Sequence, residues 1–99
     1  MSLATEFEHA LRGTYEAGKA RGYIASYFEQ MLNQHGGVET AKRLLVDSEP
    51  QTGLYRLWEL GLLKDSMEAV VLQDRFRSLF TDDEIAEAYK RLDELDYFK

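Results

Sequence analysis

Residues 81–95 read TDDEIAEAYKRLDEL and carry the clearest helix signal of the chain. Thr81 followed by Glu84 predicts a capping box, in which the hydroxyl accepts the amide three residues on and the glutamate reaches back. Asp82 and Asp83 add negative charge at the positive end of the helix dipole. Apolar residues then recur every three to four positions, at Ile85, Ala88, Tyr89, Leu92 and Leu95. The residues expected to face water are Glu87, Lys90, Arg91 and Glu94.

The same spacing divides the rest of the chain into further short helices, each closed by glycines or polar residues. We expect them at Thr5–Ala20, closed by Gly22; Ile24–His35, ended by Gly36-Gly37; Val38–Leu45; Thr52–Leu60, ended by Gly61; and Asp65–Phe80, opened by an Asp65/Glu68 capping box and bending near Asp74. No stretch alternates with a period of two, so no sheet is expected. The sequence predicts an all-α fold, a compact single-domain bundle of five to six short helices.

Composition sets the broad class of the protein. Ninety-nine residues with 44% hydrophobic content suit one globular domain, and a net charge of -6 is too small to imply disorder. The chain has no cysteine, which removes disulfides and thiolate nucleophiles and fits a reducing cytoplasm. No apolar run approaches the roughly 20 residues of a membrane span. We therefore expect a soluble cytoplasmic protein spanning residues 1–99, and we interpret residues 1–3 as an expression-vector remnant.

Several short blocks between residues 22 and 95 resemble a small bacterial all-helical module of uncharacterised function. These blocks include Gly22-Tyr23, Tyr27-Phe28, Met31-Leu32, Gly36-Gly37, Thr40-Ala41-Lys42, Leu57-Trp58-Glu59-Leu60-Gly61, Glu68-Ala69-Val70-Val71-Leu72 and Leu79-Phe80-Thr81. Such modules occur alone or appended to larger, sometimes nuclease-like proteins, and often have proline where this chain has Ala25. The resemblance implies a bacterial stand-alone or accessory domain and brings no catalytic residues with it.

Catalytic and metal chemistry find little support in the sequence. Glu6 and His9 form one Glu-x-x-His pair, but a di-iron bundle needs two such pairs and two further carboxylates. His35 lies on the apolar stripe of the 24–35 helix, so we expect a partly buried, hydrogen-bonded histidine and single it out only for its pH-sensitive charge. We assign no catalytic, cofactor-binding or metal-binding residue.

Nucleic-acid binding is the leading alternative function. Helices 38–45 and 52–60 with the loop between them could form a helix-turn-helix. Its contacts would come from Lys42, Arg43, Gln51, Thr52, Tyr55 and Arg56. The net charge of -6 argues against it, because phosphate binding gains its energy from a positive face.

A protein-interaction role agrees better with the sequence. Aromatic residues are enriched at interfaces, and the chain has more of them than a six-helix core of this size requires: Tyr23, Tyr27, Tyr55, Trp58, Tyr97 and Phe98. We nevertheless expect most of these six to lie in the core. Tyr97 and Phe98 are the exception, and we expect them to dock on a surface of this chain or of a second copy. The predicted function is a non-catalytic protein-interaction or accessory module of the bacterial cytoplasm, acting through a protein partner or self-association. A DNA-associated module is the alternative, and a small helical enzyme comes third.

Overall fold

The computed structural model describes residues 2–47 and 52–99, and within these ranges the chain is helical, with no strand. Its elements are α1 (Leu3–Ala20), α2 (Ser26–Val46), α3 (Thr52–Glu59), η1 (Leu63–Asp65), α4 (Met67–Val71), η2 (Asp74–Leu79) and α5 (Asp82–Glu94), where η denotes a 3-10 helix. The all-α prediction is confirmed. None of the described helices is long and apolar enough to traverse a bilayer.

Three of the helices end in the same way, with a residue of positive φ just beyond the last turn. Gly22 after α1, Gly61 after α3 and Asp96 after α5 have φ of 88°, 72° and 60°. At each end the amide of the next residue bonds back to a carbonyl five residues earlier, which is the Schellman motif. The two glycines were predicted as helix ends. Asp96 was not, because aspartate occupies this conformation less often.

Helix α2 joins two segments that the sequence predicted as separate helices. Gly36 has φ 78° and ψ 174°, which lie outside the helical region, so two helical segments meet at a kink there and the predicted helix end at Gly36-Gly37 is confirmed. The next residue, Gly37, lies against α1, and a Cβ atom at this position would be 2.6 Å from Glu8 Cα. The Gly37 amide also donates to Glu8 Oε1 at 3.2 Å. The glycine pair therefore bends α2 and lets its backbone approach α1.

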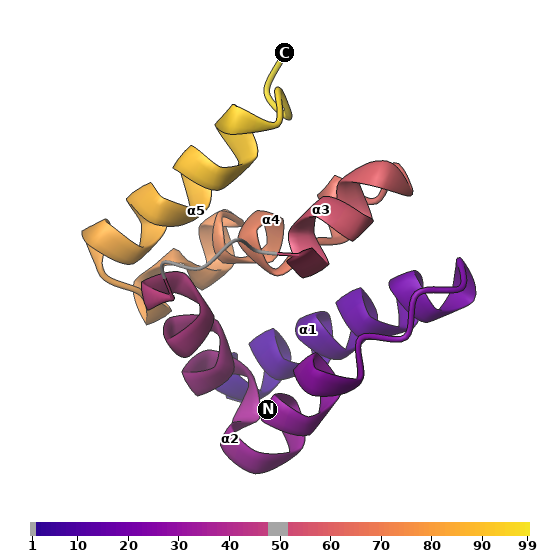
Figure 1. The fold of residues 1–99 in the computed structure, drawn as a ribbon. Coiled ribbons are helices and arrows are strands. Elements are labelled where there is room, and N and C mark those ends of the chain that lie inside the picture. Colours follow the sequence, from indigo (N-terminus) through magenta and orange to yellow (C-terminus); the bar gives the residue numbers. More distant parts are fainter. Residues whose placement is uncertain (1, 48–51) are drawn as a thin grey trace.

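The main core is built around Phe7, which is fully buried in α1. Its ring meets those of Phe76 and Phe80 edge-on, with centroids 5.2 and 5.1 Å apart. Met67 and leucine, valine and alanine side chains from α1, α2, α4 and α5 complete this cluster. Helix α4 lies between α1 below and α5 above in Figure 1. The radius of gyration, 12.4 Å, is that of one domain of this length.

The predicted 65–80 helix is wrong in its start and in its continuity. Ser66, not Asp65, caps α4, because its hydroxyl accepts the Ala69 amide at 3.2 Å. Glu68 does not reach back to form a capping box, and its side chain is buried. After Val71 the chain leaves the α-helical path and continues as η2. This change of direction turns Phe76 into the core.

Ser2 and Leu3, which the sequence analysis set aside, take part in the fold. The Ser2 hydroxyl caps α1 by accepting the Thr5 amide at 3.1 Å. Leu3 is partly buried and packs against the main core. Both residues therefore contribute to the first helix of the domain.

Candidate functional site

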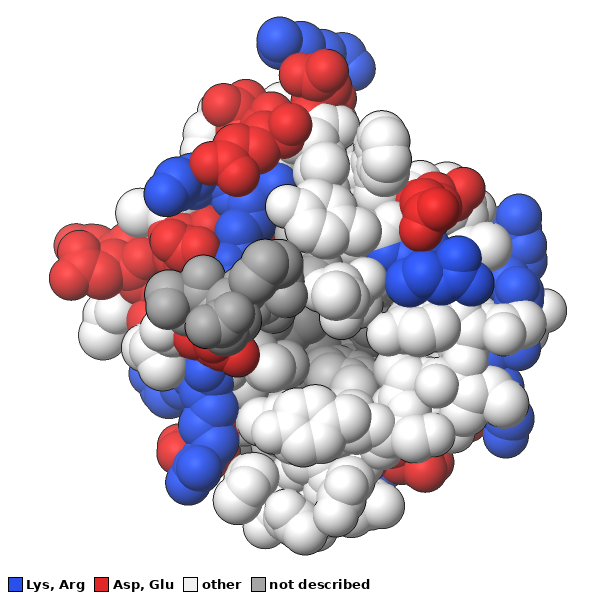
Figure 2. All heavy atoms as spheres, in the orientation of Figure 1, with Lys and Arg blue, Asp and Glu red and all other residues white. Residues whose placement is uncertain are grey.

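A hollow of about 380 Å³ opens on the surface between α1, both halves of α2, α3 and α4. Figure 2 shows a depression near the centre of the view, with uncharged residues above it, below it and to its right. Its walls are mainly apolar and include Tyr15, Phe28, Met31, Leu54 and Leu57. This volume lies within the range of ordinary binding pockets in proteins. The hollow is therefore our candidate functional site.

Tyr23 connects the two sides of the hollow. Its position depends on Gly18, because a Cβ atom there would lie 3.2 Å from the Tyr23 carbonyl oxygen and 3.3 Å from its ring. The Tyr23 hydroxyl reaches α3, where a Cβ atom on Gly53 would lie 3.2 Å from it. The Arg56 guanidinium lies over the Tyr23 ring at 5.6 Å. The end of α1 and the start of α3 thus form one continuous wall.

Two large apolar side chains of the hollow are exposed to solvent. Ile24 is 59% exposed and Tyr27 is 70% exposed, although both lie at helical spacing from the buried Met31. Tyr55 and Trp58 of α3 are about half exposed as well. The expectation that most of these aromatic residues lie in the core is wrong. The short helices leave apolar surface uncovered, and part of it adjoins the hollow.

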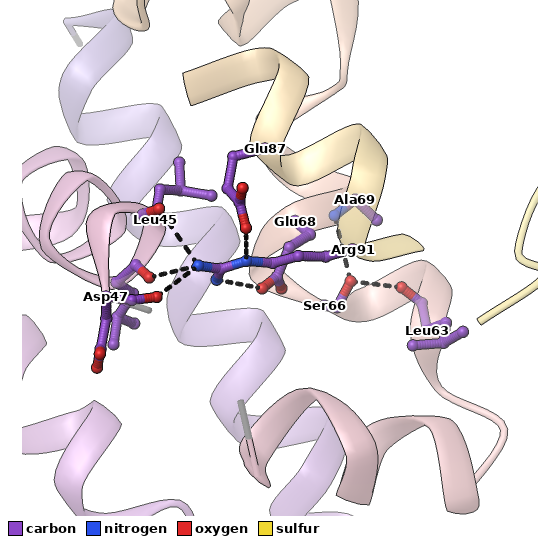
Figure 3. Close-up of polar contacts among 9 residues, drawn as sticks. Leu45, Asp47, Leu63, Ser66, Glu68, Ala69, Glu87 and Arg91 are labelled. Atoms are coloured by element: carbon purple, nitrogen blue, oxygen red, sulfur yellow. Dashed lines mark hydrogen bonds and ion pairs between the residues drawn. The ribbon is translucent and has the colours of Figure 1, made fainter. Parts of the chain in front are cut away.

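The floor of the hollow contains a buried carboxylate, that of Glu68 in α4. Its Oε2 atom accepts a hydrogen bond from Arg91 of α5 at 3.2 Å. Arg91 also donates to Glu87 Oε2 at 2.6 Å and to the backbone carbonyls of Leu44, Leu45 and Asp47 at 3.0 to 3.2 Å. Figure 3 shows the guanidinium between these groups. Arg91 therefore satisfies the last carbonyls of α2 and joins α2, α4 and α5.

Arg91 was predicted to face water, and this prediction is wrong, since its side chain is only 8% exposed. The available signal was its spacing: Arg91 follows the buried Ala88 by three positions, so it shares the inward face of α5. An arginine on such a face needs partners, because a buried charge is costly unless paired. The sequence does not identify the partners, which are distant along the chain.

Burial raises the pKa of Glu68 above its ordinary value, because the floor removes the carboxylate from water. The ion pair with Arg91 acts in the opposite direction and only partly offsets this effect. Glu87 shares the same guanidinium and adds a repulsive negative charge. Two carboxylates thus compete for one cation beneath the hollow.

The residues of the helix-turn-helix hypothesis are not brought together as a basic face. Lys42 pairs with Glu84 at 2.8 Å and Arg43 pairs with Glu39 at 3.0 Å. Thr52, Tyr55 and Arg56 are exposed on α3, and Gln51 lies outside the described residues. Helix α3 packs mainly against η1, and its contact with α2 is slight (Figure 1). The two helices therefore do not form a packed pair.

His35 is exposed at the bend of α2, so the expected burial is wrong. The bend ends the apolar stripe one turn earlier than helical spacing suggested. Within residues 2–47 and 52–99 no group of three metal-ligating side chains comes together. His35 takes no part in the hollow.

At the C-terminal end, Phe98 folds back onto α5. Its ring stacks on Tyr89 with centroids 4.5 Å apart and an interplanar angle of 13°. Tyr97 meets Phe98 edge-on at 5.2 Å. All three rings remain between one third and one half exposed. They form a second apolar surface, separate from the lining of the hollow.

Comparison of the chain with known protein families, with curated proteins and with solved structures finds no match. No other protein therefore indicates which residues of this chain are functional, and the hollow is the feature on which a function can be based.

Proposed function

We propose that this chain is a non-catalytic interaction module that binds apolar side chains of a protein partner in the hollow. One observation carries the proposal: an apolar depression is bordered by Ile24 and Tyr27, both more than half exposed. Large apolar side chains grouped at a depression commonly mark an interaction surface. Tyrosine in particular is enriched at interfaces, because its ring buries apolar area while its hydroxyl stays hydrated.

The form of the surface favours a protein over a small ligand or a nucleic acid. The exposed apolar side chains extend the contact area beyond the space inside the hollow, and a protein segment would cover both. Among the described residues of the lining, the charged ones are Asp47 and Glu68, and both acids would repel a phosphate backbone. An accessory role in the bacterial cytoplasm is part of this proposal, and its support is the cysteine-free sequence and the resemblance described above.

Photo-crosslinking at two matched tyrosines tests the proposal. Benzoylphenylalanine replaces Tyr27, which lines the hollow, or Tyr55, which is exposed outside it. A partner of the hollow is expected to crosslink in cells at position 27 and not at position 55. The captured protein is then purified, and its affinity is measured for the Tyr27→Ser and Tyr55→Ser variants.

We expect Tyr27→Ser to weaken binding about tenfold and Tyr55→Ser to leave it within about twofold, as for central and peripheral interface residues. Equal affinity of the two variants, or equal crosslinking at the two positions, would overturn the proposal. A mobility-shift assay with generic duplex DNA at low salt is expected to show no complex. A complex that dissolves as salt rises would support the DNA-associated alternative instead.

A further inference from the structure

We infer that the partner presents a carboxylate, that of a glutamate or aspartate, beside the apolar side chain that enters the hollow, and that this carboxylate binds Lys19 and Arg56. This inference rests on the proposed function and specifies the chemistry of the partner.

Two cations lie against tyrosine rings on one side of the hollow. Tyr15 and Tyr23 are both lining residues. The Lys19 ammonium is 5.9 Å from the centre of the Tyr15 ring, and the Arg56 guanidinium is 5.6 Å from that of Tyr23. Lys19 belongs to the last turn of α1 and Arg56 to α3, so the two cations come from two helices. Figure 2 shows basic residues to the right of the depression, on the side where α1 ends in Figure 1.

The two cations remain open to a further anion. Both residues are exposed to solvent. Lys19 forms no ion pair with a carboxylate of residues 2–47 or 52–99. Arg56 is 3.6 Å from Glu59, and an exposed pair of this kind is weak. A guanidinium that stacks on a ring still has N–H groups at its edge, which can bind a carboxylate through two parallel hydrogen bonds.

The acids of the chain do not prevent a carboxylate from binding at this side. Glu68 is already paired with Arg91 at 3.2 Å. Asp47 follows α2, whose end lies at the left of Figure 1, whereas α1 ends at the right, so a single carboxylate can bind far from it. Residues 78–99 hold seven acidic and three basic residues, which accounts for −4 of the net charge of −6. Exposed charges more than about 8 Å apart are largely screened at physiological salt, so the partner responds mainly to the two nearby cations.

Three sets of peptide probes test the inference. Each set contains acetylated, amidated hexapeptides in which position X stands between apolar positions randomised over Leu, Ile and Phe, with X fixed as glutamate, glutamine or lysine. Binding is followed by amide chemical shifts of the labelled protein. The glutamate set is expected to shift the amides of Gly18, Tyr23 and Gly53 and to bind at least about fivefold more tightly than the glutamine set, with lysine weakest. Added salt should reduce the advantage of glutamate.

Two double variants with the same change of charge assign the effect to this side of the hollow. Lys19→Met/Arg56→Met keeps the apolar stems and is expected to bring the glutamate and glutamine sets to within about twofold of each other. Arg43→Met/Lys90→Met removes two exposed cations outside the described lining and should leave the preference unchanged. Equal binding of the glutamate and glutamine sets by the wild type, or equal effects of the two double variants, would refute the carboxylate and leave the proposed function standing. If no probe shifts the amides of the hollow, the proposed function fails as well.

Discussion

Replacing Arg91 by methionine is expected to lower the free energy of unfolding by about 3–5 kcal/mol. Methionine retains the apolar stem, so the change removes the guanidinium and its bonds to Glu68, Glu87 and the end of α2. Removing one partner of a buried pair is costly because the other charge stays buried without compensation. Since domains of this size are stable by only about 5–15 kcal/mol, the loss is a large part of the total.

Urea denaturation followed by circular dichroism measures this loss, and the thermal midpoint should fall by at least about 12 °C. Arg43→Met is the matched control, because Arg43 pairs with Glu39 on the surface and both side chains are half exposed. Such a pair contributes at most about 1 kcal/mol. The double variant Arg91→Met/Glu68→Met should be more stable than Arg91→Met alone, since the buried carboxylate is removed with its partner and Glu87, 34% exposed, stays in contact with water. A loss below about 1 kcal/mol for Arg91→Met, or an equal loss for Arg43→Met, would refute the reasoning.

Four further changes have distinct expected outcomes. Gly37→Ala should destabilise the fold by about 1–3 kcal/mol in thermal unfolding, because its Cβ would clash with α1; Gly13→Ala, with open space around it, should stabilise the fold by about 1 kcal/mol. Partial burial raises the pKa of Glu84, but hydrogen bonds from a lysine and from the helix cap outweigh it and lower the pKa below the ordinary 4.5. Glu84→Gln should therefore be less stable than the wild type at about pH 7, and the difference should shrink as pH falls below 4.5, in urea titrations at each pH. Deleting residues 97–99 removes the ring stacked on Tyr89 and should cost about 1 kcal/mol by the same denaturation assay; an unchanged midpoint would show that this stacking does not stabilise the domain.

The sequence predicted those parts of the fold that depend on neighbouring residues. The capping box of Thr81 and Glu84 forms as expected, with bonds of 2.8 and 3.2 Å, because all of its atoms lie within one turn. Gly22 and Gly61 end their helices for a similarly local reason. Asp65 and Glu68 have the same spacing as a capping box, but Ser66 lies closer to the helix start and Glu68 turns inward to Arg91. A tertiary contact overrides the local signal at that position.

The candidate site could not be predicted, because its residues come from four helices that are distant in sequence. The aromatic content did suggest an interaction surface, but not which rings stay exposed. Tyr27 lies at helical spacing from the buried Met31 and yet is 70% exposed, because none of the helices described within residues 2–47 and 52–99 covers that end of the α2 stripe. Exposure of this kind depends on the relative placement of helices, which apolar spacing does not determine.

The contacts of Arg91 also have a kinetic consequence. Its hydrogen bonds to the end of α2 connect residues that are separated by 44 to 47 positions in the sequence. These bonds can form only when α5 is docked on the rest of the domain. Contacts that form after the rate-limiting step of folding leave the folding rate unchanged and slow the reverse reaction. If the contacts of Arg91 form after this step, they set the lifetime of the native state. That lifetime in turn determines how well the domain resists irreversible inactivation.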